Sequence, residues 1–345
     1  MVRAIRYRQP RYRSGSGQAI AHCADVRVQF FFLRRARVRY LCVLLILAGC
    51  AAERDSGELF GPVAESMLVV DALLLVDQGL PPVYVRRSLA PDQTYSRQVA
   101  AVAGARVQVL QGEQVYDYRA DPDSAGLYWP PDGAPRVMEN TQYRLQVEVD
   151  GHQVRGQTTT PARLRIRESV LVDEETLEVV RSLKSFAEAG EGVYGAPENQ
   201  LVYLDDLLEA RIDTVDVQAY QIALFSLDPE SDFVITADFL EDDDFEEFER
   251  EGASPPLAVQ DGIVRLPWFA VAFQGCYLVK IYALDHNWFE YARSSPDENE
   301  GGFAGGLAGD NFERPLFQLE GGIGLFGSAS VDSLGFFVLP QAEDE

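Results

Sequence analysis

Short segments that alternate apolar and polar residues fill the chain from about residue 66 onward, and this period of two predicts β-strands. In the first half, Asp150-Gly151 is a two-residue hairpin signal between two such segments. Turns rich in Pro, Asp, Gly and Asn separate the others. We therefore expect an immunoglobulin-like or fibronectin-like β-sandwich over 65–163, with strands at 67–76, 83–89, 105–110, 114–118, 126–129, 143–149 and 152–155.

Residues 164–340 predict a second β-rich domain with a short helical insertion. Apolar residues at helical spacing over 174–189, followed by Gly190, predict that helix. An acidic loop at 241–251 and a glycine-rich flexible loop at 294–309 interrupt the strand pattern. The expected strands lie at 166–172, 215–227, 233–235, 262–273, 276–284, 316–319 and 331–339.

A secretory signal precedes these domains. Arginines lead into an apolar run at 41–48, which is much shorter than the roughly 20 residues that span a bilayer. The run ends in a lipobox, Leu47-Ala48-Gly49, followed by Cys50. We predict that 1–49 is removed, that Cys50 carries the acyl chains, and that 50–64 is a lipidated tether. Residue 51 is Ala rather than Asp, which favours the outer membrane over retention at the inner membrane.

Residues 1–33 are rich in arginine and make the signal unusually long, so we expect that translation begins further downstream. The first 49 residues contain ten Arg and one Asp, and their removal changes the net charge from −24 to −33. This charge argues against nucleic-acid binding by a basic surface. Lysine is limited to Lys184 and Lys280, which favours a halophile-like acidic surface over that of an ordinary acidic secreted protein.

The sequence offers few candidates for chemistry. Gly322–Gly327 fits the spacing G-x-G-x-x-G, but a strand is expected after it, which favours a bulge or tight corner over dinucleotide binding. Cys276 has no partner for a disulfide and is interpreted as a small buried hydrophobe. His152 and His286 are far apart, so zinc is not expected. We expect no cofactor and no enzymatic activity.

Two acidic segments are weak candidates for a cation site. Asp242, Asp243 and Asp244 offer the oxygen ligands that calcium prefers, although a solvated acidic surface is the favoured interpretation. Asp121, Asp123 and Ser124 could also bind a cation, but a β-turn stabilised by the side chains is more frequent in such sequences.

The segment 284–291 concentrates aromatic residues. Trp288 and Tyr291 are three residues apart and share a face if the segment is helical, and Phe289 lies between them. If exposed, these residues suit sugar stacking or a protein partner. If buried, they belong to the core, and this is the favoured interpretation.

Several of these segments together resemble domain-of-unknown-function family 4249, a group of Bacteroidota-type outer-membrane lipoproteins. The resemblance is carried by the lipobox, 104–107, 126–128, 143–145 and the glycine-rich 321–327, and it covers most of 50–340. The aromatic segment around Trp288 lies where members have a tyrosine-rich stretch. The family has no established biochemical role. Its members often occur beside TonB-dependent receptors, which implies a part in uptake.

We therefore expect a non-enzymatic, lipid-anchored protein of the outer membrane that assists a TonB-dependent receptor in substrate capture or uptake. Its partners would be the bilayer, through the acyl chains on Cys50, and that receptor. The alternatives are a structural or adhesive cell-surface protein, and a hydrolase whose carboxylates the sequence does not single out.

Overall fold

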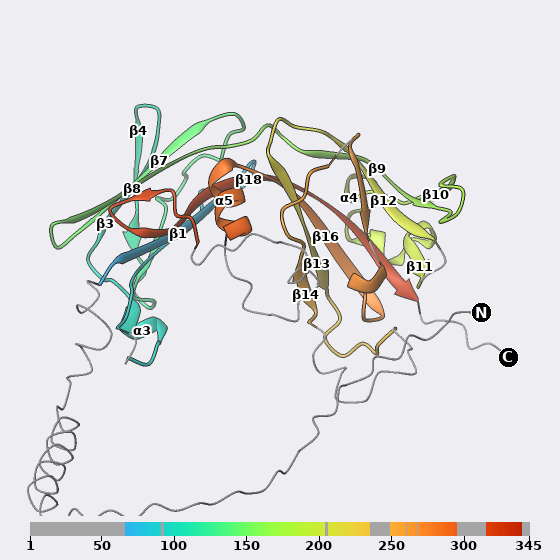
Figure 1. Cartoon of the computed structure of the whole chain (residues 1–345), viewed down its shortest axis with the longest axis horizontal. Helices are drawn as coiled ribbons and strands as arrows, with labels where there is room; N and C mark the ends of the chain where they lie inside the picture. Colours follow the sequence, from blue (N-terminus) through green and yellow to red (C-terminus); the bar gives the residue numbers. More distant parts are fainter. Residues whose placement is uncertain are drawn as a thin grey trace, which may run out of the picture. The chain divides into compact units, whose positions relative to one another are not determined.

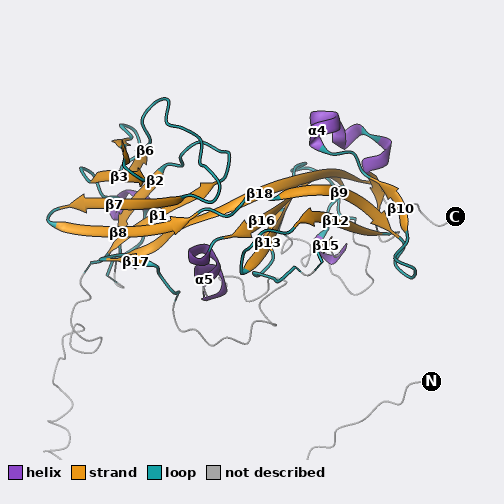
Figure 2. Cartoon of the chain, turned by 90° about the horizontal axis from the view of Figure 1, so that it is seen from above, coloured by secondary structure: helices purple, strands orange, loops and turns teal. Residues whose placement is uncertain are grey.

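The computed structural model describes residues 66–90, 93–203, 206–234, 249–259, 261–266, 268–294 and 315–339. All of them belong to one compact unit, Ala64–Glu345. The fold is mainly β, as the alternating pattern predicts, and strands dominate Figure 2. The signal segment with Cys50, the candidates Asp242, Asp243 and Asp244, and most of the glycine-rich loop lie outside the described residues.

The first half of the described chain contains short strands, several of which alternate buried and exposed side chains. In β7, for example, every second side chain is buried. These elements are β1 (Leu68–Leu75), β2 (Val83–Arg87), α3 (Arg97–Ala100), β3 (Arg106–Gln111), β4 (Gln114–Asp117), β5 (Arg119–Ala120), β6 (Leu127–Trp129), β7 (Gln142–Val149) and β8 (His152–Thr159).

The second half mixes strands with short helical turns. Its strands are β9 (Arg165–Val172), β10 (Val179–Ser182), β11 (Gln200–Val202), β12 (Leu207–Asp213), β13 (Ala219–Ser226), β14 (Glu251–Ala253), β15 (Ile263–Leu266), β16 (Gly275–Leu284), β17 (Leu319–Glu320) and β18 (Ile323–Leu339). Its helices are α4 (Phe186–Ala189), α5 (His286–Ser294) and the 3₁₀ turns η1 (Gly190–Gly195), η2 (Pro197–Asn199) and η4 (Trp268–Ala270).

The described strands form three sheets, and β18 organises the largest. That sheet has the order β14-β13-β16-β18-β1-β2-β6-β5, with β11 also paired to β18. β18 runs parallel to β1 and antiparallel to β16, so the last described strand lies beside the first one (Figure 1). The two smaller sheets have the orders β10-β9-β12-β15 and β17-β8-β7-β3-β4.

Two hydrophobic cores lie along β18. The first is built from side chains between Leu68 and Val154, together with Phe326 of β18. The second is built from side chains between Leu164 and Ala283, together with Leu334, Phe336 and Val338 of the same strand. The largest sheet contains strands of both predicted domains, and its strand β18 contributes side chains to both cores. The domain boundary near residue 163 stays a prediction.

The helix predicted over 174–189 is wrong for most of its length. Residues 179–182 form strand β10, and only Phe186–Ala189 are α-helical. The Asp173 side chain accepts hydrogen bonds from the backbone N–H groups of Glu175 and Thr176 at 3.1 and 2.7 Å, which stabilises a turn where the helix should begin. Leu177 has a φ of 56°, which no helix accommodates.

The glycine-rich segment 321–327 leads into and forms the first part of β18, and no helix follows it. Gly324 has a φ of 114°, and a Cβ atom there would lie 2.3 Å from the carbonyl oxygen of Val70 on β1. The interpretation that these glycines allow backbones to approach closely is confirmed. In the described part of the chain, no helix is long and apolar enough to cross a membrane.

Candidate functional site

A buried polar cluster lies where β16 ends and α5 begins. Asp285 is 7% exposed and caps α5, since its Oδ1 accepts a hydrogen bond from the backbone N–H of Trp288 at 2.9 Å. The same oxygen accepts a hydrogen bond from the backbone N–H of Ser328 on β18 at 3.0 Å. Its Oδ2 accepts a hydrogen bond from the Thr158 hydroxyl at 2.5 Å. One carboxylate therefore connects α5, β18 and β8.

Asn287 extends this cluster. Its Nδ2 donates to the carbonyl oxygens of Gln157 on β8 at 2.6 Å and Phe326 on β18 at 2.8 Å. β16 stops pairing with β18 at Leu284, which lies opposite Ala329. On this side, the backbone groups of β18 that precede Ala329 therefore need other partners. The side chains of Asp285 and Asn287 supply them, which makes the cluster a joint between the regions on either side of it.

The protonation of Asp285 is dominated by its burial. Desolvation raises the pKa of this carboxyl above its ordinary value, while the hydrogen bonds from Thr158, Ser328 and Trp288 oppose the rise. Each of its oxygens is already bonded to a protein donor. This arrangement favours a structural role for the carboxyl over proton transfer to a substrate.

The aromatic residues singled out from the sequence lie on α5, so the condition under which Trp288 and Tyr291 share a face is met. Trp288, Phe289 and Tyr291 are all half-buried. The Trp288 ring lies 5.5 Å from that of Tyr282, and the Tyr291 ring lies 6.2 Å from that of Phe317. These contacts attach α5 to the sheet and leave part of each ring accessible, so their role as a ligand or partner surface stays a prediction.

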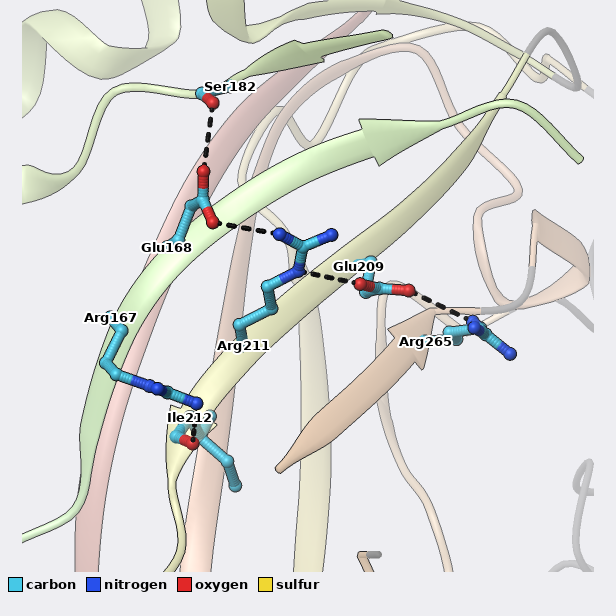
Figure 3. A network of polar contacts seen from close by, with 7 residues as sticks. All are labelled: Arg167, Glu168, Ser182, Glu209, Arg211, Ile212 and Arg265. Carbon is cyan, nitrogen blue, oxygen red and sulfur yellow. Dashed lines mark hydrogen bonds and ion pairs between the residues drawn. The ribbon is translucent and has the colours of Figure 1, made fainter. Parts of the chain in front are cut away.

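A second polar cluster lies on the sheet β10-β9-β12-β15 (Figure 3). Glu209 is only 3% exposed and binds the Nε atoms of Arg211 at 2.9 Å and Arg265 at 3.2 Å. Arg211 also binds Glu168 at 3.1 Å, and Glu168 accepts a hydrogen bond from Ser182 at 3.2 Å. The bond to Glu209 is the main reason that the pKa of Arg211 is raised. Both carboxylates are paired with arginines, which favours a structural role.

Other candidates from the sequence have ordinary surroundings. Asp121 accepts hydrogen bonds from the backbone N–H groups of Asp123 and Ser124, both at 2.8 Å, so the turn interpretation is confirmed. Cys276 is a half-buried free thiol whose pKa is raised to about 11, mainly by desolvation, which keeps it protonated at neutral pH. Among the described residues, no three His, Cys, Asp or Glu side chains are arranged to bind a metal ion.

One surface was missed by the sequence reasoning. Tyr84 on β2 and Trp129 on β6 are exposed by 46% and 47%, while their neighbours Val83 and Tyr128 are buried. The alternation in Gly126-Leu127-Tyr128-Trp129 contains the signal, because Leu127 and Trp129 must point away from a buried Tyr128. We call Tyr84 and Trp129, with the half-buried Leu127 between them, the aromatic face.

Comparison with known proteins identifies the family of this chain. Residues 58–335 match the family described as domain of unknown function (DUF4249). The match covers most of the chain, which therefore belongs to this family. A search of curated proteins finds no match.

Proposed function

We propose that this protein is a non-enzymatic, lipid-anchored protein of the outer membrane that assists a TonB-dependent receptor in capturing or admitting a substrate. The observation that supports a binding role is the aromatic face, where Tyr84 and Trp129 are exposed on neighbouring strands of one sheet. Exposed Tyr and Trp side chains are enriched at binding hot spots.

The buried carboxylates support the non-enzymatic part of the proposal. Asp285 and Glu209 are both enclosed, and their oxygens are bonded to donors of the protein itself. A general acid or base needs an oxygen within hydrogen-bonding reach of a substrate proton. These two carboxyls instead stabilise the joint and the four-stranded sheet.

The lipobox supports the anchored part, and its test is direct. We expect cells that express the wild-type chain with radiolabelled palmitate to yield a labelled protein in the outer-membrane fraction. The variant Cys50→Ala should be unlabelled and should leave that fraction. Label on the Cys50→Ala variant, or an unlabelled wild-type protein, would contradict the anchor.

The partner is tested by affinity purification from detergent-solubilised outer membranes. We expect a TonB-dependent receptor to be recovered with the tagged wild-type chain and to be absent with an unrelated tagged lipoprotein. An intact bait that recovers no receptor contradicts the accessory role. A deletion strain that takes up every substrate normally but loses surface attachment would favour an adhesive function instead.

A further inference from the structure

The aromatic face places two rings side by side on neighbouring strands. Tyr84 is paired with Leu127 across β2 and β6, and Trp129 follows two residues later on β6. Both side chains therefore point away from the core that contains Val83 and Tyr128. Diagonal neighbours in an antiparallel pair are about 7–8 Å apart, which is within the length of a disaccharide.

The ring of Trp129 has a fixed orientation. Its Nε1–H donates to Oδ2 of Asp121 at 2.6 Å, and Oδ1 of the same carboxylate holds the turn at 121–124. The bond to Trp129 is the main reason that the pKa of Asp121 is lowered, so this acceptor stays ionised at neutral pH. A ring that is ordered before binding loses less conformational entropy when a ligand stacks on it.

Charged side chains border the two rings. Arg119 is paired with Trp129 across β5 and β6, and its well-exposed side chain is held only loosely, 4.0 Å from Asp132. On the other side, Asp71 is opposite Tyr84 across β1 and β2 and forms an ion pair with Arg86. The face thus combines apolar ring surfaces with hydrogen-bond donors and acceptors at its margins.

This combination selects one class of ligand. The rings accept the apolar C–H faces of a pyranose, and the charged margins accept its hydroxyl groups. An anionic ligand is disfavoured because the chain carries a net charge of −24, or −33 without its signal. A stable protein partner usually covers about 800 Å² on each side, far more than two exposed rings offer.

We propose that the aromatic face binds an uncharged oligosaccharide, with Trp129 and Tyr84 stacking on its sugar rings and Arg119 bonding to its hydroxyls. This inference rests on the proposed function, since it names the class of substrate that the anchored protein captures. Trp129 provides the stacking platform with the fixed orientation, and Tyr84 extends it to a second sugar unit.

The test uses the full-length lipidated protein in lauryldimethylamine oxide, because a sugar-based detergent would compete for the face. Hexaoses of α-1,4-glucose, β-1,4-glucose, xylose and mannose are titrated by calorimetry and by tryptophan fluorescence. The chain has three tryptophans, and Trp268 is buried while Trp129 is exposed. We expect at least one hexaose to bind and to change the fluorescence of the wild-type protein but not that of Trp129→Phe.

Variants locate the site. We expect Trp129→Ala and Tyr84→Ala each to weaken binding at least tenfold and Arg119→Ala to weaken it a fewfold. Val115→Ala is the matched control, because this side chain is also 47% exposed but lies on β4 of another sheet, and it should bind as the wild type does. Circular dichroism confirms that each variant is folded.

The outcomes separate this inference from the proposed function. Failure of the folded wild-type protein to bind any hexaose, or equal binding by Trp129→Ala and Tyr84→Ala, overturns the sugar site. If Trp129→Ala instead loses only the receptor, the face belongs to a protein partner, which also overturns it. Sugar binding without recovery of a receptor supports the site and contradicts the accessory role.

Discussion

The two regions that flank β18 differ in how some of their strands pair. In the first region, β7 and β8 pair through the two-residue turn Asp150-Gly151, and β3 and β4 pair through an equally short turn. In the second region, β12 pairs with β9 and β15, which are distant in the chain. Local pairing leaves a readable alternating pattern, whereas distant pairing depends on partners that no short segment reveals.

The two regions also bind β18 differently. The first relies on a close backbone approach, since Gly324 leaves room for the Val70 carbonyl of β1. The second pairs with β18 through β16 and adds side-chain packing, as in Tyr277 and Phe336, whose rings are stacked with centroids 5.4 Å apart. The joint around Asp285 lies between the two regions. Each mode therefore predicts a different sensitivity to substitution.

The largest effect is expected for Gly324→Ala. Alanine at a φ of 114° is strained, and its Cβ would meet the Val70 oxygen at 2.3 Å, so β1 and β18 must separate. We expect a loss of about 3–5 kcal/mol in the free energy of unfolding, measured by chemical denaturation. Gly133→Ala is the control, since Gly133 also has a positive φ, of 75°, but open space around it, and it should lose about 1 kcal/mol. Equal losses in the two variants would disprove the close-approach argument.

Asp285→Ala tests the joint. The substitution leaves the backbone N–H groups of Ser328 and Trp288 without their acceptor in a buried place, and the Thr158 hydroxyl keeps only the Ser328 hydroxyl as a partner. We expect a loss of about 2–4 kcal/mol in the free energy of unfolding. Hydrogen exchange should show faster opening at the N–H of Ser328 than at that of Phe336, which lies within the second core. Uniform acceleration along β18 would mean that the joint does not separate the two regions.

Glu209→Gln tests the second region alone. The amide keeps one acceptor but presents a donor to one of the two arginines, and Arg211 and Arg265 stay partly solvated. We expect a loss of about 1–2 kcal/mol, measured by thermal and chemical unfolding. Ser182→Ala, at the far end of the same network, should change stability by less than about 0.5 kcal/mol. A larger effect at Ser182 than at Glu209 would contradict the central role of Glu209.

The same comparison explains what could be predicted from the sequence. The strands of the first region were located closely, because their alternation is local. β12 was missed, although Leu208, Ala210 and Ile212 alternate with Glu209 and Arg211, since helix-forming residues obscure the pattern. The first part of β18 was expected to be a bulge or tight corner because it is rich in glycine. It forms a strand only because β1 and β16 pair with it.

The residues of the candidate site also differ in how far the sequence alone could predict their roles. Trp129 could have been found, because the alternation along β6 determines its direction from its immediate neighbours. The role of Asp285 could not, because its partner Thr158 lies 127 residues away and Ser328 lies 43 residues away. The sequence identified the segment 284–291 through its aromatic residues. The structure shows that its polar residues Asp285 and Asn287 connect the strands.

The smallest expected effect is on the pH dependence of stability. Burial raises the pKa of Asp285 in the folded protein above the unfolded value of about 3.8, although hydrogen bonds to the carboxylate limit the rise. The folded state therefore holds this proton more tightly than the unfolded state. Its contribution to stability is complete below about pH 4 and declines as the pH rises through the folded pKa. Asp285→Asn removes this dependence.

The measurement is the difference in free energy of unfolding between wild type and Asp285→Asn, taken by urea denaturation from pH 3.5 to pH 7. We expect this difference to shift against the wild type as the pH rises and then to level off above the folded pKa. The many other carboxylates titrate in both proteins and cancel in the difference. A difference that moves in favour of the wild type with rising pH would mean that the hydrogen bonds from β8, β18 and α5 outweigh burial. The hydrogen bonds of Asp285 would then stabilise the folded protein most when this carboxyl is charged.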